Sequence, residues 1–186
     1  MLLLVGLGNP GSNYTNTRHN IGFKIIDAIN EHFKLSKQKP KFKGLLTTGT
    51  INGKKVYAIK PLTFMNNSGI CIRELIEYFK IQAENVIVFH DDLDIDFGKI
   101  KTKFGGSSAG HNGIESIDKF IGKDYSRVRI GIGHPKENIN IADHVLQDFN
   151  DEEIAELNSI TDNITASIPI LIDKKLDLFS STVNNK

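Results

Sequence analysis

The sequence predicts an α/β fold, a single-domain three-layer α/β/α sandwich around a twisted, mixed but mostly parallel sheet. Residues 2–5 and 85–89 are apolar runs without polar alternation, which is typical of strands buried on both faces of a sheet. Strand-like segments alternate with segments of helical periodicity, as in sandwiches with helices on both faces. Asn52-Gly53 joins two further strand-like segments into a hairpin and supplies the antiparallel part. Because 186 residues suffice for one sizeable core and are few for two, we expect one domain over residues 1–186.

In the first half of the chain, the pattern predicts a strand, a helix and a hairpin. The strand ends at the glycine and proline cluster of residues 6–11. Residues 21–33 then carry apolar side chains at helical spacing: Ile21, Ile25, Ile29 and Phe33. A lysine-rich loop over residues 34–43 precedes the two hairpin strands, which we expect at 44–51 and 54–60.

The middle of the chain predicts a second helix and a second apolar strand. Residues 62–80 have a helical pattern, with Asn66, Asn67 and Ser68 as possible caps. The apolar strand over residues 85–89 follows it. A helix between two buried strands is the connection that a parallel sheet requires.

The last part of the chain predicts two strands and two helices. Residues 98–104 alternate lysines with other side chains, and period-two spacing places three ammonium groups on one face of a strand: Lys99, Lys101 and Lys103. A glycine-serine turn leads to a helix near residues 114–121, and residues 127–133 form a further strand pattern. A long amphipathic helix begins at Asp151, and Pro169 should kink or end it.

Composition is ordinary for a globular protein, but charge is unevenly distributed. The net charge of +1 combines nine acidic and three basic side chains over residues 141–186 with 13 acidic and 20 basic ones before them. A basic body is compatible with a nucleic-acid partner, although a solvated lysine-rich surface is the commoner explanation. No segment approaches the ~18 apolar residues of a membrane span, and the N-terminus lacks the pattern of a signal peptide. Cys71 is the only cysteine, which excludes an internal disulfide and predicts a cytoplasmic protein.

Three short motifs suggest other functions, and each fits poorly. Residues 6–11 match G-x-G-x-x-G, but no helix opens at the last glycine and the candidate acid, Glu31, lies inside the predicted helix. Residues 92–96 begin like a calcium loop whose sixth and twelfth positions would be Phe97 and Lys103 instead of glycine and glutamate. We therefore expect no metal and no cofactor. The G-x-S-x-G match around Ser108 would make that serine an esterase nucleophile, but a turn capped by serine is the simpler interpretation.

His19 and Asp91 form the remaining candidate site. Each lies at or beyond the carboxyl end of a predicted buried strand, the edge where open α/β sheets keep their active sites. A carboxylate bonded to one imidazole nitrogen fixes the tautomer, so that the other nitrogen can take a proton from water. Asn9, Asn66 and Asn112 occupy separate loops at the same edge, where their amides can orient a substrate and stabilise an oxyanion.

Five blocks of the sequence resemble, in order and spacing, the signature blocks of bacterial-type peptidyl-tRNA hydrolase. They are GLGNPGSNYTNTRHNIGF, PLTFMNNSG, HDDLD, GGSSAGHNG and RVRIGIGHP, and the resemblance runs from residue 2 to about residue 150. It implies a monomeric cytoplasmic hydrolase of translation that cleaves the ester between the peptide and the terminal ribose of peptidyl-tRNA and so recycles tRNA. It implies no cofactor, no membrane association and no obligate protein partner.

The resemblance also implies roles for individual residues. His19 is similar to the family's catalytic base and Asp91 to its partner, with Asn9 beside them. Matching positions imply contacts with substrate or tRNA for eight further residues: Tyr14, Phe64, Asn66, Asn112, Lys101, Lys103, His111 and Arg129. The turn over residues 105–110 departs from some members by carrying Ser107-Ser108-Ala109, which leaves its contacts open.

The expected mechanism is water attack on the ester carbonyl, with His19 as the base, amide donors at the oxyanion and no covalent intermediate. A Ser108 esterase acting on small acyl esters is the first alternative, and fluorophosphonate labelling would favour it. A non-catalytic RNA-binding module is the second, and RNA binding without hydrolysis would favour that.

Overall fold

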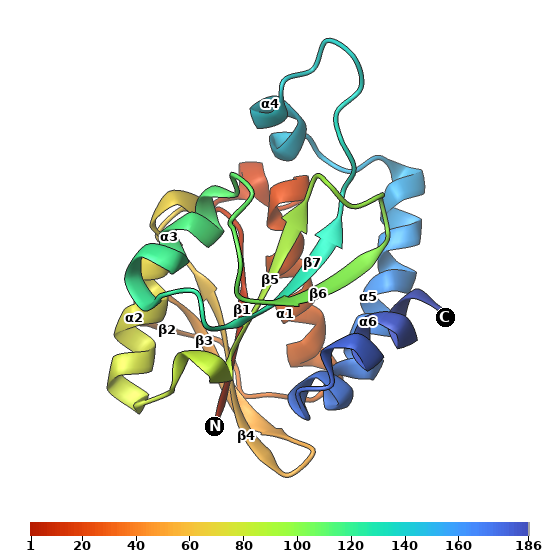
Figure 1. Ribbon diagram of the computed structural model, residues 1–186. Helices are drawn as coiled ribbons and strands as arrows, with labels where there is room; N and C mark the ends of the chain where they lie inside the picture. Colours follow the sequence, from red (N-terminus) through yellow and green to blue (C-terminus); the bar gives the residue numbers. More distant parts are fainter. Residues whose placement is uncertain (186) are drawn as a thin grey trace.

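The computed structural model describes residues 1–185, and Figure 1 shows a twisted sheet with helices packed on both of its faces. The sheet has seven strands in the order β2-β3-β4-β1-β5-β7-β6. The strands are β1 (Leu2–Gly6), β2 (Lys39–Lys41), β3 (Gly44–Ile51), β4 (Lys54–Pro61), β5 (Val86–Asp92), β6 (Ile100–Phe104) and β7 (Ser126–Gly131). The α-helices are α1 (Ile21–His32), α2 (Ser68–Phe79), α3 (Asn112–Ile121), α4 (Ile141–Leu146), α5 (Asp151–Ile172) and α6 (Leu176–Asn184). Single 3-10 turns are η1 (Ser12–Tyr14), η2 (Arg18–Asn20), η3 (Met65–Asn67) and η4 (Ala83–Asn85).

The sheet is mixed, as the sequence predicts. The central strands β4, β1, β5 and β7 are parallel to one another. The hairpin partner β3 pairs antiparallel to β4, and β6 pairs antiparallel to β7 at the opposite end. The carboxyl ends of the central strands therefore lie along one edge, where the side chains that follow them meet.

Two hydrophobic cores flank the sheet, and β1 contributes to both. Leu2 and Leu4 pack into the core beneath α1, α5 and α6, whereas Leu3 and Val5 pack into the core beneath α2 and α3. Successive residues of a strand point to opposite faces, so a strand covered on both sides has no position for a polar side chain. This is the physical reason for the unbroken apolar run at the N-terminus.

Two element boundaries differ from the sequence prediction. The second apolar strand runs on to Asp92, because β7 pairs with it as far as Gly131, so Asp91 lies inside the strand and not beyond it. The long helix continues past Pro169 for another turn to Ile172. Buried side chains in that turn, such as Leu171, hold it against the core despite the lost backbone hydrogen bond.

The predicted helix caps are also different. Asn67 occupies the N-cap of α2 without a side-chain cap hydrogen bond, because the turn η3 leads directly into the helix. No serine caps α3, whose first turn is bonded by the His111 ring. The short elements β2, α4 and α6 were not predicted. Within residues 1–185, no helix has the length and hydropathy needed to cross a bilayer.

Candidate active site

Three elements bring an imidazole, a carboxylate and a second imidazole together at the carboxyl edge of the sheet. His19 lies in η2, between β1 and α1, and Asp91 is the penultimate residue of β5. His111 is the residue immediately before α3. All three side chains are almost fully buried, with 10%, 2% and 10% of their surfaces exposed.

The Asp91 carboxylate binds both histidines. His19 Nδ1 lies 2.9 Å from each carboxylate oxygen, and His111 Nε2 lies 2.9 Å from Oδ1. Burial alone would lower the pKa of His19, but the Asp91 charge and hydrogen bond outweigh burial and hold it above its ordinary value of 6.5. Burial would likewise raise the pKa of Asp91, yet the charges of and hydrogen bonds from His19 and His111 keep it far below its usual range. Asp91 is therefore a carboxylate at neutral pH.

The hydrogen bonds of His111 fix its tautomer. Its Nδ1 accepts the backbone N–H groups of Gly113 and Ile114 at 3.1 and 3.3 Å, so Nδ1 carries no proton and Nε2–H donates to Asp91. His111 thus donates to Asp91 through Nε2 and, through Nδ1, satisfies the first turn of α3. Since Asp91 accepts the Nδ1 proton of His19, the free lone pair of His19 is on Nε2.

The same tautomer bears on metal binding. Donor atoms of His19, Asp91 and His111 lie within 4.8 Å of one another, a separation that a metal ion can bridge. A neutral imidazole that binds a metal through Nε2 carries its proton on Nδ1, which at His111 would face two backbone N–H donors. The hydrogen bonds of His111 therefore require a proton on Nε2, which leaves that nitrogen unable to bind a metal.

Asn9 is held so that one end of its amide is free. Its backbone N–H donates to Asn20 Oδ1 at 2.8 Å, and its carbonyl accepts from Asn20 Nδ2 at 2.9 Å. Its side-chain Oδ1 accepts the Met65 N–H at 2.8 Å. The Nδ2 group has no protein partner among residues 1–185 and lines the cavity beside His19. It is a preorganised donor for a substrate oxygen.

These groups open into a cavity of about 620 Å³, within the usual size range of small-molecule sites. Asn66 and Asn112 line it from η3 and from the start of α3. Phe64 also lines it, with a ring that is 54% exposed and a backbone at φ +60°, which is strained for a bulky residue. The short helix α4 and the side chain of Leu93 supply an apolar wall.

The basic residues form a separate face beside this cavity. Lys101 on β6 is directly opposite Arg129 on β7, and Lys103 follows on the same face of β6. Arg129 Nε also binds Asp92 at 2.8 Å. Neither these cations nor Tyr14 of η1 line the cavity itself, as far as the described residues show.

The geometry does not support the Ser108 alternative. Ser108 lines the cavity, but no imidazole bonds its hydroxyl among the described residues. His111 has both ring nitrogens engaged elsewhere, and His19 directs Nδ1 at Asp91. A serine without a base is not an activated nucleophile.

Sequence reasoning missed several residues that hold this site. The Asn20 side chain bonds both the N–H and the carbonyl of Asn9. In the sequence, only its position next to His19 indicates that it belongs to the site. Arg18 Nη1 donates to the carbonyls of Gln147 and Asp148, and its Nη2 contacts both carboxylate oxygens of Glu153. These bonds tie the end of α4 and the start of α5 to η2. Arg18 and Glu153 are more than 100 residues apart in the chain, and local sequence periodicity does not reveal contacts over such a separation.

The chain matches the sequence profile of the peptidyl-tRNA hydrolase family over residues 3–186. It is 77% identical over all 186 residues to peptidyl-tRNA hydrolase of Pelagibacter ubique, with both chains fully covered. It is 45% identical to the Bacillus subtilis enzyme, over 87% of each chain. The fold superposes on a crystal structure of Acinetobacter baumannii peptidyl-tRNA hydrolase with a TM-score of 0.92 and 34% identity, over 99% of this chain and 94% of that one. The chain therefore belongs to the peptidyl-tRNA hydrolase family.

Proposed function

We propose that the chain hydrolyses the ester of peptidyl-tRNA with His19 as general base and Asp91 as its orienting carboxylate. The contact of His19 Nδ1 with both Asp91 oxygens, at 2.9 Å each, carries this proposal. This contact leaves the free lone pair of His19 on Nε2, and His19 lines the cavity. Membership of the family supplies the substrate.

In the reaction, a water oxygen attacks the ester carbonyl while His19 Nε2 takes one of its protons. The negative charge that develops on the carbonyl oxygen is stabilised by amide donors, of which Asn9 Nδ2 is the best fixed. When the tetrahedral intermediate breaks, the imidazolium returns the proton to the ribose oxygen. The products are a peptide carboxylate and a tRNA with a free terminal hydroxyl, and no group of the enzyme is acylated.

The remaining assignments concern the tRNA. Lys101, Lys103 and Arg129 form a cationic face suited to a terminal phosphate of the acceptor stem. Phe64, with its exposed ring, and Tyr14 are aromatic surfaces on which an unpaired base can stack. We place the enzyme in the cytoplasm, where translation takes place, and expect it to act as a monomer.

The test is release of tRNA from purified N-acetyl-aminoacyl-tRNA by the wild-type chain and by Ser108→Ala. Both should turn over, because Ser108 has no base. Absence of hydrolysis by the wild type would overturn the proposal. A fluorophosphonate adduct at Ser108, with activity lost in Ser108→Ala, would restore the serine esterase.

A further inference from the structure

His90 is a buried histidine that the proposed mechanism does not use. It immediately precedes Asp91 in β5 and is only 4% exposed. Alternate residues of a strand share a face, and the two preceding positions on this face are Val86 and Val88, which pack into the core beneath α2 and α3. An apolar side chain would continue that pattern, so a buried imidazole at this position requires a specific explanation.

The hydrogen bonding of His90 defines its tautomer. Its Nδ1 lies 2.7 Å from the main-chain carbonyl oxygen of Asp91, and a carbonyl oxygen only accepts hydrogen bonds, so Nδ1–H is the donor. Burial, together with the nearby His111 and Arg127 groups, lowers the pKa of His90 to about 3, although Asp91 opposes this shift. The imidazole is therefore neutral, and its buried Nε2 has no hydrogen-bond partner among residues 1–185. An apolar side chain would avoid the cost of that unpaired nitrogen, so the bond from Nδ1 is the reason we seek.

The hydrogen-bond ladder between β1 and β5 stops just before Asp91. The pairing of the two strands ends at Phe89, whose carbonyl accepts the Leu7 N–H at 3.0 Å. Carbonyl groups two residues apart in a strand face the same neighbouring strand. The next bond of this ladder would therefore run from the Asn9 N–H to the Asp91 carbonyl.

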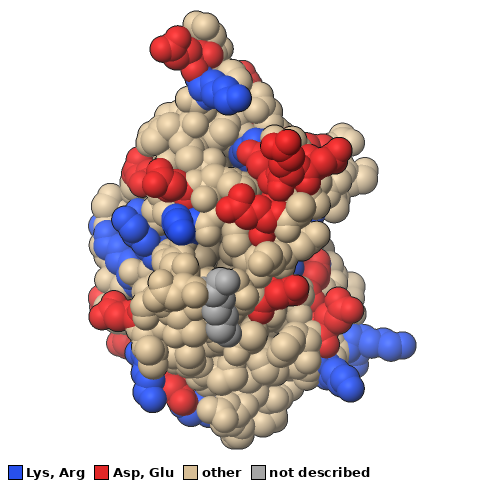
Figure 2. All heavy atoms as spheres, turned by 90° about the vertical axis from the view of Figure 1, so that its right-hand side faces the viewer, with Lys and Arg blue, Asp and Glu red and all other residues tan. Residues whose placement is uncertain are grey.

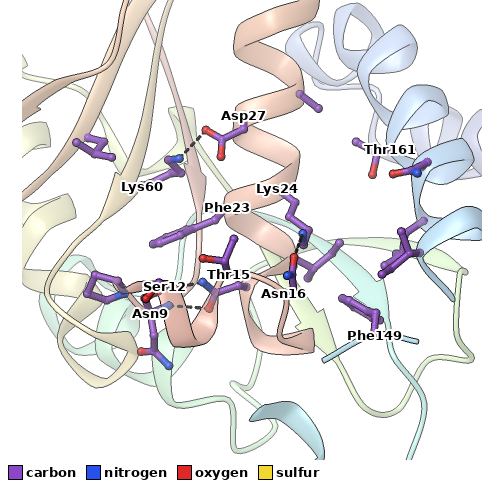
Figure 3. A pocket seen from close by; sticks show the side chains of 18 of the residues that line it. Asn9, Ser12, Thr15, Asn16, Phe23, Lys24, Asp27, Lys60, Phe149 and Thr161 are labelled. Atoms are coloured by element: carbon purple, nitrogen blue, oxygen red, sulfur yellow. Dashed lines mark hydrogen bonds and ion pairs between the residues drawn. The ribbon is translucent and has the colours of Figure 1, made fainter. Parts of the chain in front are cut away.

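The chain after β1 turns away before it forms that bond. The Asn9 N–H donates to Asn20 Oδ1 at 2.8 Å, and the Asn9 carbonyl accepts from Asn20 Nδ2 at 2.9 Å. Figure 3 shows Asn9 beside Ser12, at the pocket that α1 borders. The two chains thus separate at the active site, and the Asp91 carbonyl takes its donor from His90 in place of the missing ladder bond.

We propose that His90 is a positioning residue, which fixes the main chain at Asp91 and thereby holds the Asp91 carboxylate between His19 and His111. This inference rests on the proposed function and adds the group that orients the carboxylate. The His90 ring also meets the His111 ring edge-on, with 4.8 Å between the ring centroids, so it supports the second imidazole as well. As far as the described residues show, His90 does not line the cavity, and it acts on the reaction through Asp91.

Three substitutions of His90 test the role of the Nδ1–H donor. Asparagine places an amide nitrogen near the position of Nδ1, glutamine places it near the position of Nε2, and leucine has none. In His90→Leu and His90→Gln, kcat on N-acetyl-aminoacyl-tRNA should fall about 10-fold, because the catalytic groups are misplaced. The acid limb of kcat/KM should also move to lower pH, because a displaced Asp91 charge raises the pKa of His19 less. His90→Asn should keep the wild-type acid limb and most of kcat.

The control for packing is Val88→Ala, on the same face of β5, which should lower the melting temperature and leave the acid limb in place. NMR of the imidazole nitrogens in the wild type needs no variant that must fold, and it should show His90 as the Nδ1–H tautomer without titration over the pH range of the assay. An Nε2–H tautomer, an unmoved acid limb in His90→Leu, or equal shifts in His90→Asn and His90→Gln would each reject the positioning role. Absence of turnover by the wild type would instead refute the proposed function.

Discussion

At the active centre, one carboxylate accepts hydrogen bonds from two imidazoles, and only His19 has a ring nitrogen without a hydrogen-bond partner among the described residues. His111 keeps Nδ1 as an acceptor for the first turn of α3, so protonation there would break two hydrogen bonds. His19 has its Nε2 free and an Asp91 charge to stabilise the imidazolium. We therefore expect the proton taken from water to go to His19.

The pH dependence of turnover tests this pairing. A general base works only when neutral, so kcat/KM should fall as the pH drops through the pKa of His19, with a midpoint above 6.5. Asp91→Asn removes the charge that raises this pKa and leaves burial, which lowers it. The acid limb should then move to lower pH, and the plateau should fall by less than in His19→Ala.

The matched control for that profile is Asp94→Asn, at the rim of the same cavity, where Asp94 bonds His134. Its acid limb should stay at the wild-type position. An acid limb that also stays in place in Asp91→Asn would mean that Asp91 does not set the protonation of the base.

Asn9 should help to distinguish blocked from free amino ends. Its fixed Nδ2 can bond the amide carbonyl of an N-acylated substrate, and an aminoacyl-tRNA with a free ammonium has no such group. Asn9→Ala should narrow the ratio of rates on N-acetylated and free aminoacyl-tRNA. Asn67→Ala, a neighbouring exposed asparagine whose side chain makes no cap hydrogen bond, should leave the ratio unchanged. The assignment fails if both variants keep the wild-type ratio.

At the scale of elements, β6 is a short edge strand that carries lysines opposite the arginines of β7. Like charges this close repel, so a bound anion relieves an unfavourable interaction. Edge-strand lysines also discourage sheet-to-sheet association, which is the alternative reason for their presence.

The salt dependence of tRNA binding separates these reasons. Each phosphate contact contributes roughly 0.7 to 0.9 to the slope of log K against log salt. The Lys101→Ala, Lys103→Ala variant should bind tRNA more weakly, with a slope shallower by roughly 1 to 2 units. A minimal ester without the tRNA body should be hydrolysed almost as before. The control is the Lys37→Ala, Lys39→Ala variant near the opposite edge of the sheet, which should keep the wild-type slope. An unchanged slope in both variants would mean that the β6 lysines only protect the edge strand from association.

Elements buried on both faces were predictable, and short or exposed ones were not. The strand β1 and the first four residues of β5 are buried and carry no polar side chain, and this constraint is visible in the sequence. The strand β2 is three exposed residues long, and α4 has six residues, so neither has a periodic pattern to detect. The proximity of His19 and Asp91 followed from the carboxyl ends of parallel strands. The hydrogen bonds of His111 and Asn20 could not be predicted in this way. Those of His111 depend on its tautomer, and those of Asn20 depend on contacts with the Asn9 backbone.

At the scale of the molecule, charge is separated between faces. Figure 2 shows acidic side chains gathered on the upper part of the face that α5 and α6 form, with basic side chains toward its edges. The first turn of α5 carries Asp151, Glu152 and Glu153, which complement the helix dipole. This face repels a polyanion, so tRNA should approach the cationic face of β6 and β7.

We expect one imidazole at the carboxyl edge of this sheet, that of His19, to be the general base. The most direct measurement is kcat on N-acetyl-aminoacyl-tRNA for His19→Ala beside His134→Ala, which removes an imidazole from the same cavity. His19→Ala should lose on the order of 10²-fold or more in kcat while remaining folded, and His134→Ala should remain close to the wild type. Near-wild-type turnover of a folded His19→Ala variant would contradict the account.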